Sequence, residues 1–345
     1  MRFLLALAIV GCGNSSNQTP PDAMAVTGGD AAGSADPCGE VSCPLPAPEC
    51  ATPTTLRTYS SPSCSAGTCS FEHTDTTCIA GCSVGACLPS WDAVAGGEYT
   101  SCAHESDNHI ACWGWNSDGQ DSPPSGDFAA VFAKAFQVCG LRPTGEIACW
   151  GEVNGTPPSG SVIAMSLGVY FGCALRADHT AVCWGDGFFP NGANIAPSGT
   201  FESLAAGQIV SCGIRTDHAA VCWGRLDDQN PQPAGGTYRA ITVGQAHVVA
   251  IKSDGTLVGW GDLGNGEGVP PVGTFTQVSA GQYHTCGLHT DGTIACWGNN
   301  SQGQTDAPDG TYLAVGAGYD HTCAIRNDGA IVCWGNSNYN ETTPP

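Results

Sequence analysis

A Trp-Gly pair occurs seven times in this 345-residue chain and divides residues 91–345 into units of similar length. Successive pairs are 34 to 39 residues apart, and their tryptophans are Trp113, Trp150, Trp184, Trp223, Trp260, Trp297 and Trp334. Each unit begins with a large apolar residue at a matching offset: Trp91, Phe128, Val162, Phe201, Tyr238, Phe275 and Tyr312. Such a period is typical of solenoids and propellers, whose units cannot bury their hydrophobic faces alone.

The unit at 275–311 shows what each repeat contains. Residues Phe275–Ala280 alternate like a strand, and two further short strands, Thr285–His289 and Thr293–Trp297, flank the turn at 290–292. With 48 glycines, 23 prolines and no apolar stripe of helical period, the chain favours short strands and tight turns. We therefore predict an all-β fold, a seven-bladed β-propeller over 91–345 with three short strands in each blade. A fourth strand in each blade is left open.

Paired cysteines test the register of these strands. Six units carry two cysteines ten residues apart: Cys102 with Cys112, Cys139 with Cys149, Cys173 with Cys183, Cys212 with Cys222, Cys286 with Cys296 and Cys323 with Cys333. In a hairpin that turns at 290–292, Cys286 faces Cys296 at disulfide distance. The fifth unit lacks both cysteines and has Val249 and Gly259 instead. This joint loss favours disulfides over zinc, which would need four converging ligands.

The other nine cysteines lie before the repeats. Eight of them form a cluster in 38–88: Cys38, Cys43, Cys50, Cys64, Cys69, Cys78, Cys82 and Cys87. Such density predicts a small disulfide-rich module and an oxidising compartment. Its pairing cannot be deduced from the sequence, and metal binding by this module is the alternative.

The first residues suggest export. Met1-Arg2 precedes the apolar run Phe3–Val10, and Ile9-Val10-Gly11-Cys12 resembles a bacterial lipobox. We expect 1–11 to be a lipoprotein signal peptide, Cys12 to be the lipidated residue and 12–37 to be a flexible tether. The alternative is a short signal peptide with an incidental cysteine; the apolar run is short, which leaves the true start of the chain open. We expect a lipoprotein of the bacterial outer membrane or cell surface, or otherwise a secreted protein.

The charge of the chain limits its partners. The formal net charge is −21, and only eight basic residues lie after residue 90. Nucleic acids and anionic membrane surfaces need clustered basic residues, so we exclude both, apart from a lipid anchor at the N-terminus. Five of the eight share one repeat position, and an Asp follows two residues later in four of them, which favours local charge pairing or packing: Arg142, Arg176, Arg215, Lys252 and Arg326.

The repeat resembles that of the regulator of chromosome condensation family. The pattern G-x-x-x-x-C-x-[LI]-x-x-D-G-x-[IV]-x-C-W-G is clearest at 281–304 and 318–335, and His284 and His321 fit the family's G-x-x-H-[ST] signature. The units are shorter than eukaryotic ones and are more similar to compact bacterial members, including a propeller-type β-lactamase inhibitory protein. The resemblance implies a protein-binding scaffold. Guanine-nucleotide exchange fits poorly with export and disulfides.

Candidate catalytic or metal-binding residues mostly have a simpler interpretation. His179 and His218 occupy a turn position that glycine fills in four other units, which predicts a positive φ. His247, His284 and His321 recur at one position, and we expect a structural hydrogen bond within each blade rather than a metal site. Two oxygen-rich segments, 116–119 and 262–267, sit at repeat turns and lack the full spacing of a calcium loop. We predict no catalytic residue, no metal site and no cofactor.

Function is expected where the repeats differ, in the loops after each Trp-Gly. These loops carry unexplained aromatic and acidic residues: Trp115, Phe188, Phe189, Asp227, Asp228 and Tyr339. Exposed aromatic side chains on a rigid scaffold are common binding anchors, although they could instead pad neighbouring blades. We predict a non-catalytic, monomeric binding protein whose partner is a protein or glycan with a cationic patch. The alternatives are a hydrolase or lyase with carboxylates or calcium in the ring centre, and an architectural envelope protein.

Overall fold

The computed structural model describes residues 8–11, 44–52, 55–65, 68–77, 82–83, 86–87, 91–185, 192–225, 233 and 235–345. These residues fall into two compact units, Met1–Leu88 and Pro89–Pro345. Their regular structure consists of strands and turns, as the glycine-rich, turn-rich sequence predicts. Over this part of the chain there is no helix with the length and apolarity needed to cross a membrane.

The first unit contains a small antiparallel sheet in the order β1-β4-β3-β2. Its strands are β1 (Ala8–Gly11), β2 (Glu49–Thr52), β3 (Thr55–Ser65) and β4 (Thr68–Thr77), and a short pair is formed by β5 (Cys82–Ser83) and β6 (Ala86–Cys87). Cys50 and Cys69 each take part in a disulfide. β1 lies within the segment predicted as a signal peptide and pairs with β4. Cys12 and the predicted tether 12–37 lie outside the described residues.

The second unit is a seven-bladed β-propeller, which confirms the fold predicted from the repeats. Each blade is one three-stranded antiparallel sheet, and no described blade has a fourth strand. The first four blades are β7 (Trp91–Gly96), β8 (Thr100–Glu105), β9 (Ile110–Gly114); β10 (Ala130–Lys134), β11 (Gln137–Leu141), β12 (Ile147–Gly151); β13 (Val162–Leu167), β14 (Gly172–Arg176), β15 (Ala181–Trp184); and β16 (Phe201–Ala206), β17 (Val210–Arg215), β18 (Ala220–Gly224). The last three are β19 (Tyr238–Val243), β20 (His247–Lys252), β21 (Leu257–Gly261); β22 (Phe275–Ala280), β23 (His284–His289), β24 (Ile294–Gly298); and β25 (Tyr312–Ala317), β26 (His321–Arg326), β27 (Ile331–Gly335).

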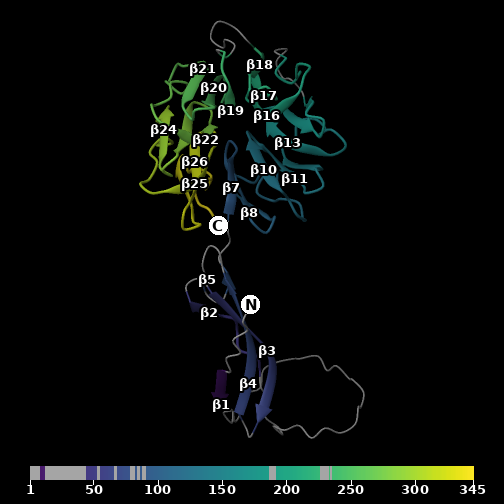
Figure 1. Cartoon of the computed structure of the whole chain (residues 1–345), viewed down its shortest axis with the longest axis vertical. Helices are drawn as coiled ribbons and strands as arrows, with labels where there is room; N and C mark the ends of the chain where they lie inside the picture. The colour runs from purple at the N-terminus through teal and green to yellow at the C-terminus, as the bar shows by residue number, and fades with distance from the viewer. Residues whose placement is uncertain are drawn as a thin grey trace. The chain divides into compact units, whose positions relative to one another are not determined.

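The ring closes between the seventh and the first blade. Figure 1 shows the sheets in chain order, with β25 and β26 beside β7. The backbone N–H of Tyr319 donates to Gly97 O at 2.8 Å, and the indole N–H of Trp113 donates to Glu341 O at 2.8 Å. Polar and packing contacts therefore join the two ends of the repeat array.

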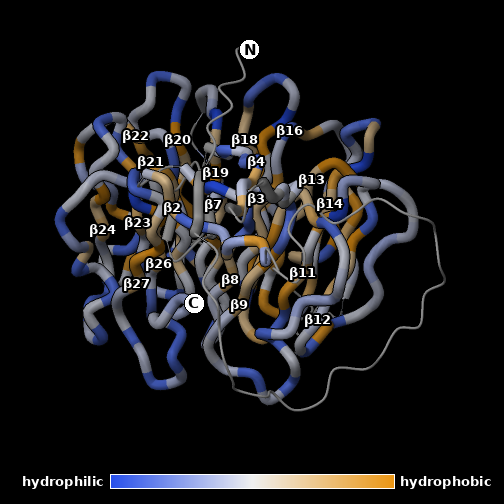
Figure 2. The backbone as a smooth tube through the Cα atoms, turned by 90° about the horizontal axis from the view of Figure 1, so that it is seen from below, coloured by the Kyte–Doolittle hydropathy of each residue, from blue (hydrophilic) through white to orange (hydrophobic). Residues whose placement is uncertain are grey.

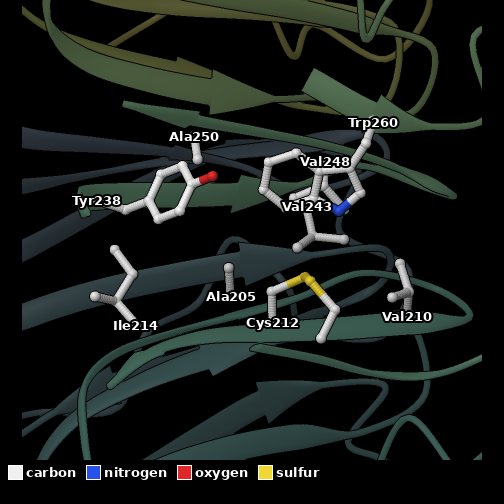
Figure 3. Close-up of a cluster of buried hydrophobic side chains, with 10 residues drawn as sticks. Ala205, Val210, Cys212, Ile214, Tyr238, Val243, Val248, Ala250 and Trp260 are labelled. Carbon is white, nitrogen blue, oxygen red and sulfur yellow. A yellow bond between two sulfur atoms is a disulfide. The ribbon is translucent and has the colours of Figure 1, made fainter. Parts of the chain in front are cut away.

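The core lies between neighbouring blades. In the cluster of Figure 3, Cys212 and Ile214 on the fourth blade pack against Tyr238, Val248 and Trp260 on the fifth. One blade thus presents its disulfide and aliphatic residues to the aromatic face of the next. The strands accordingly carry most of the hydrophobic segments in Figure 2, and the connecting loops are mostly hydrophilic. Burial of such side chains contributes about 25 cal/mol per Å² of apolar area.

In the described chain, five of the seven repeated tryptophans also donate an indole N–H to a backbone carbonyl of a neighbouring loop. Trp150 donates its indole N–H to Gln120 O at 2.9 Å, and Trp334 donates to Gln304 O at 2.9 Å. In both pairs the acceptor lies 30 residues earlier, in the loop that follows the preceding blade. The tryptophan of the Trp-Gly pair therefore joins neighbouring blades by a hydrogen bond, in addition to its hydrophobic packing.

The six predicted cysteine pairs are disulfides in the structure. In every pair the two residues are directly opposed on the second and third strands of one blade, with Cα atoms 4.0 Å apart. The register Cys286↔Cys296 is the one that the turn at 290–292 predicts. In chain order the bonds join Cys102 to Cys112, Cys139 to Cys149, Cys173 to Cys183, Cys212 to Cys222, Cys286 to Cys296 and Cys323 to Cys333. Each bond closes a hairpin that is already joined by strand pairing.

The fifth blade has the same register without the disulfide. Val249 pairs with Gly259, as Cys286 pairs with Cys296 in the sixth blade. A Cβ atom on Gly259 would overlap with the carbonyl group of Gly268, in the loop after β21. The loop therefore occupies the space that a second cysteine side chain would need.

This arrangement predicts that the missing disulfide cannot simply be restored. We expect the double variant Val249→Cys with Gly259→Cys to be less stable than the wild type by about 1–3 kcal/mol, the usual cost of overpacking a filled site. Thermal unfolding and thiol titration measure this; two extra free thiols are expected. A higher melting temperature with no extra thiol would contradict the proposed role of Gly268.

Candidate functional site

Seven loops between the first and second strands of the blades surround one mouth of the central channel. We call them the mouth loops; each begins five residues before the first cysteine position. This first residue is glycine in six blades and lysine in one: Gly97, Lys134, Gly168, Gly207, Gly244, Gly281 and Gly318. At Gly207 and Gly281 a Cβ atom would overlap with the carbonyl oxygen of the next blade, which explains the glycine.

Backbone hydrogen bonds join the mouth loops into a ring with one gap. The bonds are Glu98 N→Ala135 O, Val169 N→Gly207 O, Gln208 N→Gln245 O, Gln245 N→Gln282 O, Gln282 N→Tyr319 O and Tyr319 N→Gly97 O, at 2.8–3.3 Å. Among the described loops, only the junction of the second and third blades has no such bond. The second blade differs there from the repeat: it has Lys134, and Ala135 has a positive φ of 49°. Positive φ in a residue other than glycine is a strained conformation that often accompanies function.

Lys134 extends across the channel. Its ammonium group contacts Val243 O at 3.3 Å and Ala280 O at 3.4 Å, in the fifth and sixth blades. Burial lowers the pKa of this amine to about 8, because an enclosed site disfavours the charged form. A lysine with a shifted pKa inside a cavity is a candidate functional residue.

The mouth loops enclose a cavity of about 370 Å³ above Lys134. Its lining residues are Gly96, Gly97, Glu98, Lys134, Ala135, Phe136, Val169, Tyr170, Gln208, Gln245, Gln282, Tyr283, Gly318 and Tyr319. Lys134 and Glu98 are the charged residues of this lining. Burial raises the pKa of Glu98, which also receives a hydrogen bond from Tyr99 and is repelled by Asp320 and Glu152. The cavity is therefore a polar and aromatic cup with one basic and one acidic group.

The central channel itself offers little chemistry. The cavity along the first strands measures about 340 Å³, and its described lining contains no Asp or Glu. Thr242 Oγ1 and Ser279 Oγ on this lining accept hydrogen bonds from Ala280 N and Ala317 N of the next blade. No group of three or more His, Cys, Asp or Glu side chains in the described chain is placed to hold a metal ion. The structure thus gives no support to the alternative of a carboxylate or calcium site in the ring centre.

The three repeated histidines make hydrogen bonds between blades, which corrects the prediction of a bond within each blade. His247 Nε2 donates to Thr285 Oγ1 and His284 Nε2 donates to Thr322 Oγ1, both at 2.9 Å. Both threonines donate onward to backbone carbonyls, which assigns the proton to Nε2. His321 bonds Ser101 Oγ at 2.8 Å in the same way and ties the seventh blade to the first.

Two other histidines are turn residues, as predicted. His179 and His218 both have φ of 66°, and Asn108 has 74° at the equivalent position. Of the two roles predicted for the basic residues beside these turns, charge pairing or packing, Arg142 and Arg215 show packing. Asp178 and Asp217 instead accept backbone N–H bonds from Thr180 and Ala219 within the turn. The guanidinium groups pack on rings: Arg142 lies 4.6 Å from the centroid of Phe128, and Arg215 lies 5.3 Å from that of Phe201.

Two of the predicted aromatic anchors form one cluster at the junction of the seventh and first blades. Trp115 and Tyr339 have ring centroids 4.4 Å apart, and Tyr99 lies 5.6 Å from Trp115 and 4.7 Å from Tyr339. Tyr339 is 39% exposed and Trp115 is half-buried. They line a shallow hollow of about 350 Å³ with Asn116, Ser117, Asn338 and Asn340. The two rings therefore both pad the junction and present apolar surface to solvent.

The remaining predicted site residues are divided between turns and undescribed segments. Phe188, Phe189, Asp227 and Asp228 lie outside the described residues. In the oxygen-rich loop 262–267, Asp262 accepts from Gly264 N and Glu267 accepts from Asn265 N, and in the loop 116–119 Asp118 accepts from Gln120 Nε2, so these carboxylates serve the turns.

Lys134 and Glu98 are the site residues that the sequence reasoning missed, because it looked for aromatic side chains in the loops after each Trp-Gly. Alignment of the mouth loops could have revealed Lys134, since it replaces a glycine that the other six repeats share.

The sixth and seventh blades match a known repeat family. A family model described as regulator of chromosome condensation (RCC1) repeat covers residues 275–304 and 313–341. Two of the seven blades therefore match this repeat. No curated protein matches its sequence.

Several solved structures resemble this chain. The ectodomain of the receptor kinase CR4 from Physcomitrella patens is 27% identical, with a TM-score of 0.60 over 72% of this chain and 74% of that one. The CRINKLY WD40 ectodomain of the Arabidopsis thaliana receptor kinase ACR4 is 24% identical, with a TM-score of 0.62 over 75% and 100%. Human WBSCR16 is 12% identical, with a TM-score of 0.59 over 74% and 89%. The last two comparisons establish the fold alone.

The buried histidines predict acid sensitivity. Burial lowers the pKa of His247 and His284 to about 3 and that of His321 to about 4, from an ordinary value of 6.5. Between pH 6.5 and 4 the unfolded chain binds protons that these folded residues do not, so the free energy of unfolding falls as pH falls. In His321→Gln, which copies Gln137 of the second blade, this loss should be smaller by about 2–3 kcal/mol at pH 4.5. Urea unfolding at pH 7 and 4.5 measures the difference; equal losses would refute it.

Lys134 makes the stability of the protein depend on pH in the alkaline range. Its pKa is about 8 in the folded protein and 10.5 ordinarily, so the folded chain loses this proton first. Unfolding free energy should therefore rise from pH 8 to 10.5, by about 3 kcal/mol from this group. Lys134→Met should be more stable than the wild type at pH 7 and should lack this rise. Urea unfolding of both proteins at pH 7 and 10 provides the measurement, and a parallel rise in the variant would count against the buried amine.

Proposed function

We propose that this protein is an extracellular, non-catalytic binding protein that captures a protein partner on the face formed by the mouth loops. The observation that carries the proposal is the cluster of Tyr99, Trp115 and Tyr339. It combines partly exposed aromatic surface with a rigid position between two sheets, the usual character of a binding anchor.

The charge of this face favours a basic patch on the partner. Asp320 and Glu152 lie close enough to Glu98 to help raise the pKa of that carboxyl, and the whole chain carries a net charge of −21. Opposite charge speeds encounter and restricts the choice of partner more than it raises affinity. A glycan that carries positive charge is the second candidate partner, and the test below distinguishes it from a protein.

An extracellular position is supported by two observations. The blades contain six disulfides, which persist in oxidising compartments. Two of the similar structures are receptor-kinase ectodomains. Attachment of the chain to a bacterial membrane through a lipid on Cys12 is part of the proposal, and mass spectrometry of the mature N-terminus tests it.

The binding face is tested with the full chain as bait, on material from its native surroundings. After a captured protein has been purified, its affinity for the double variant Trp115→Ala with Tyr339→Ala should be at least about tenfold weaker than for the wild type. Surface plasmon resonance measures the affinity, and thermal unfolding verifies that the variant is folded.

The matched control is Leu313→Ala, which removes a 60% exposed apolar side chain at the start of β25, beside the hairpin turn of the sixth blade. Its affinity should equal that of the wild type. Equal binding by the aromatic double variant would reject this face, and binding to purified glycans without any protein would favour the second candidate.

A further inference from the structure

The mouth cavity has a composition that the fold does not require. Of its charged lining residues, Lys134 replaces a glycine that the other six blades keep, and Glu98 occupies a position that the other loops fill with Ala, Val, Gln or Tyr. Since six loops close the ring without a lysine, the blade architecture alone does not explain an ammonium group here. Departures from a repeat that otherwise holds are expected at functional positions.

We propose that this cavity binds a small zwitterion, a molecule with one carboxylate and one ammonium group, such as a short peptide. None of the three rings of the aromatic cluster lines this cavity, and the inference does not rest on the proposed function. A volume of about 370 Å³ lies within the range of small-molecule pockets.

The carboxylate of the ligand would bind at the floor. An ammonium group has three N–H donors. That of Lys134 donates to Val243 O at 3.3 Å and to Ala280 O at 3.4 Å. Within the described chain it has no carboxylate partner. The amides of Gln245 and Gln282 follow these carbonyls by two residues and line the same cavity. This side therefore offers one cation and several amide donors to an anionic oxygen.

The ammonium group of the ligand would bind on the side of the first and seventh blades. Glu98 lines the cavity there and has no ion-pair partner in the described part of the chain. Tyr319 of the seventh blade, which bonds Gln282, adds an aromatic ring whose face attracts cations. Opposite charges on two sides of one cavity match a dipolar ligand better than a simple anion or cation.

One further group lacks a partner. The side-chain oxygen of Gln245 is buried and accepts no hydrogen bond from the described residues. A buried polar atom without a partner costs stability unless a ligand or water satisfies it. An N–H donor of a bound peptide would supply the missing bond.

Isothermal titration calorimetry with the full chain tests this site. The probe is glycylglycine, compared with N-acetylglycylglycine, which lacks the ammonium group, and with glycylglycinamide, which lacks the carboxylate. We expect glycylglycine to bind and each single-charge analogue to bind at least about tenfold more weakly, because each loses a charge-assisted hydrogen bond. Absence of heat from glycylglycine up to about 10 mM overturns the proposal.

Two variants assign the poles. Lys134→Met should weaken the affinity for glycylglycine at least about tenfold and leave the affinity for glycylglycinamide unchanged. Glu98→Gln should likewise weaken the affinity for glycylglycine and leave the affinity for N-acetylglycylglycine unchanged. Lys134→Gly, which copies the other six blades, is the second variant if the methionine perturbs the loop. Thermal unfolding verifies folding of each. Undiminished glycylglycine binding in folded Lys134 variants would show that the lysine only fills the channel, and would overturn the proposal.

Discussion

The propeller depends on the contact between the two unlike faces of its blades. One face carries the disulfide and aliphatic side chains, and the aromatic face of the next blade covers it, as Cys212 and Ile214 meet Tyr238 and Trp260. Neither face could be buried by a single three-stranded sheet, so each blade is stable only with neighbours. The indole N–H groups of Trp113 and Trp334 add direction, because each bonds the loop of the preceding blade.

The same dependence explains why the polar residues at the blade junctions are so regular. His284 bonds Thr322 in the next blade, and His321 bonds Ser101 across the closure of the ring. These buried imidazoles join adjacent sheets by hydrogen bonds. In the described chain they form no cluster that could hold a metal ion. A closed ring needs the junction between its ends to match the others, and Ser101 takes the role that threonine has elsewhere.

The mouth cavity lies where this regularity stops. The hydrogen-bond ring of the mouth loops is interrupted beside Lys134, and Ala135 adopts a positive φ there. A scaffold that repeats one solution seven times can tolerate one such departure, since six other junctions maintain the ring. In our proposal, this one departure gives the ring a ligand site without loss of its architecture.

The sequence alone determined the all-β class, the seven blades, the strand limits within 275–298 to one residue and all six blade disulfides. Local rules suffice for these features, because a ten-residue spacing around a tight turn fixes which residues oppose each other. Tertiary structure alone decided the partners of the histidines, the steric reason for Gly259 and the neighbours of Lys134. Each of these depends on atoms from another blade or a distant loop, which no spacing within one unit specifies. The aromatic cluster shows the boundary between the two: Trp115 and Tyr339 were predicted separately, and only closure of the ring brought them together.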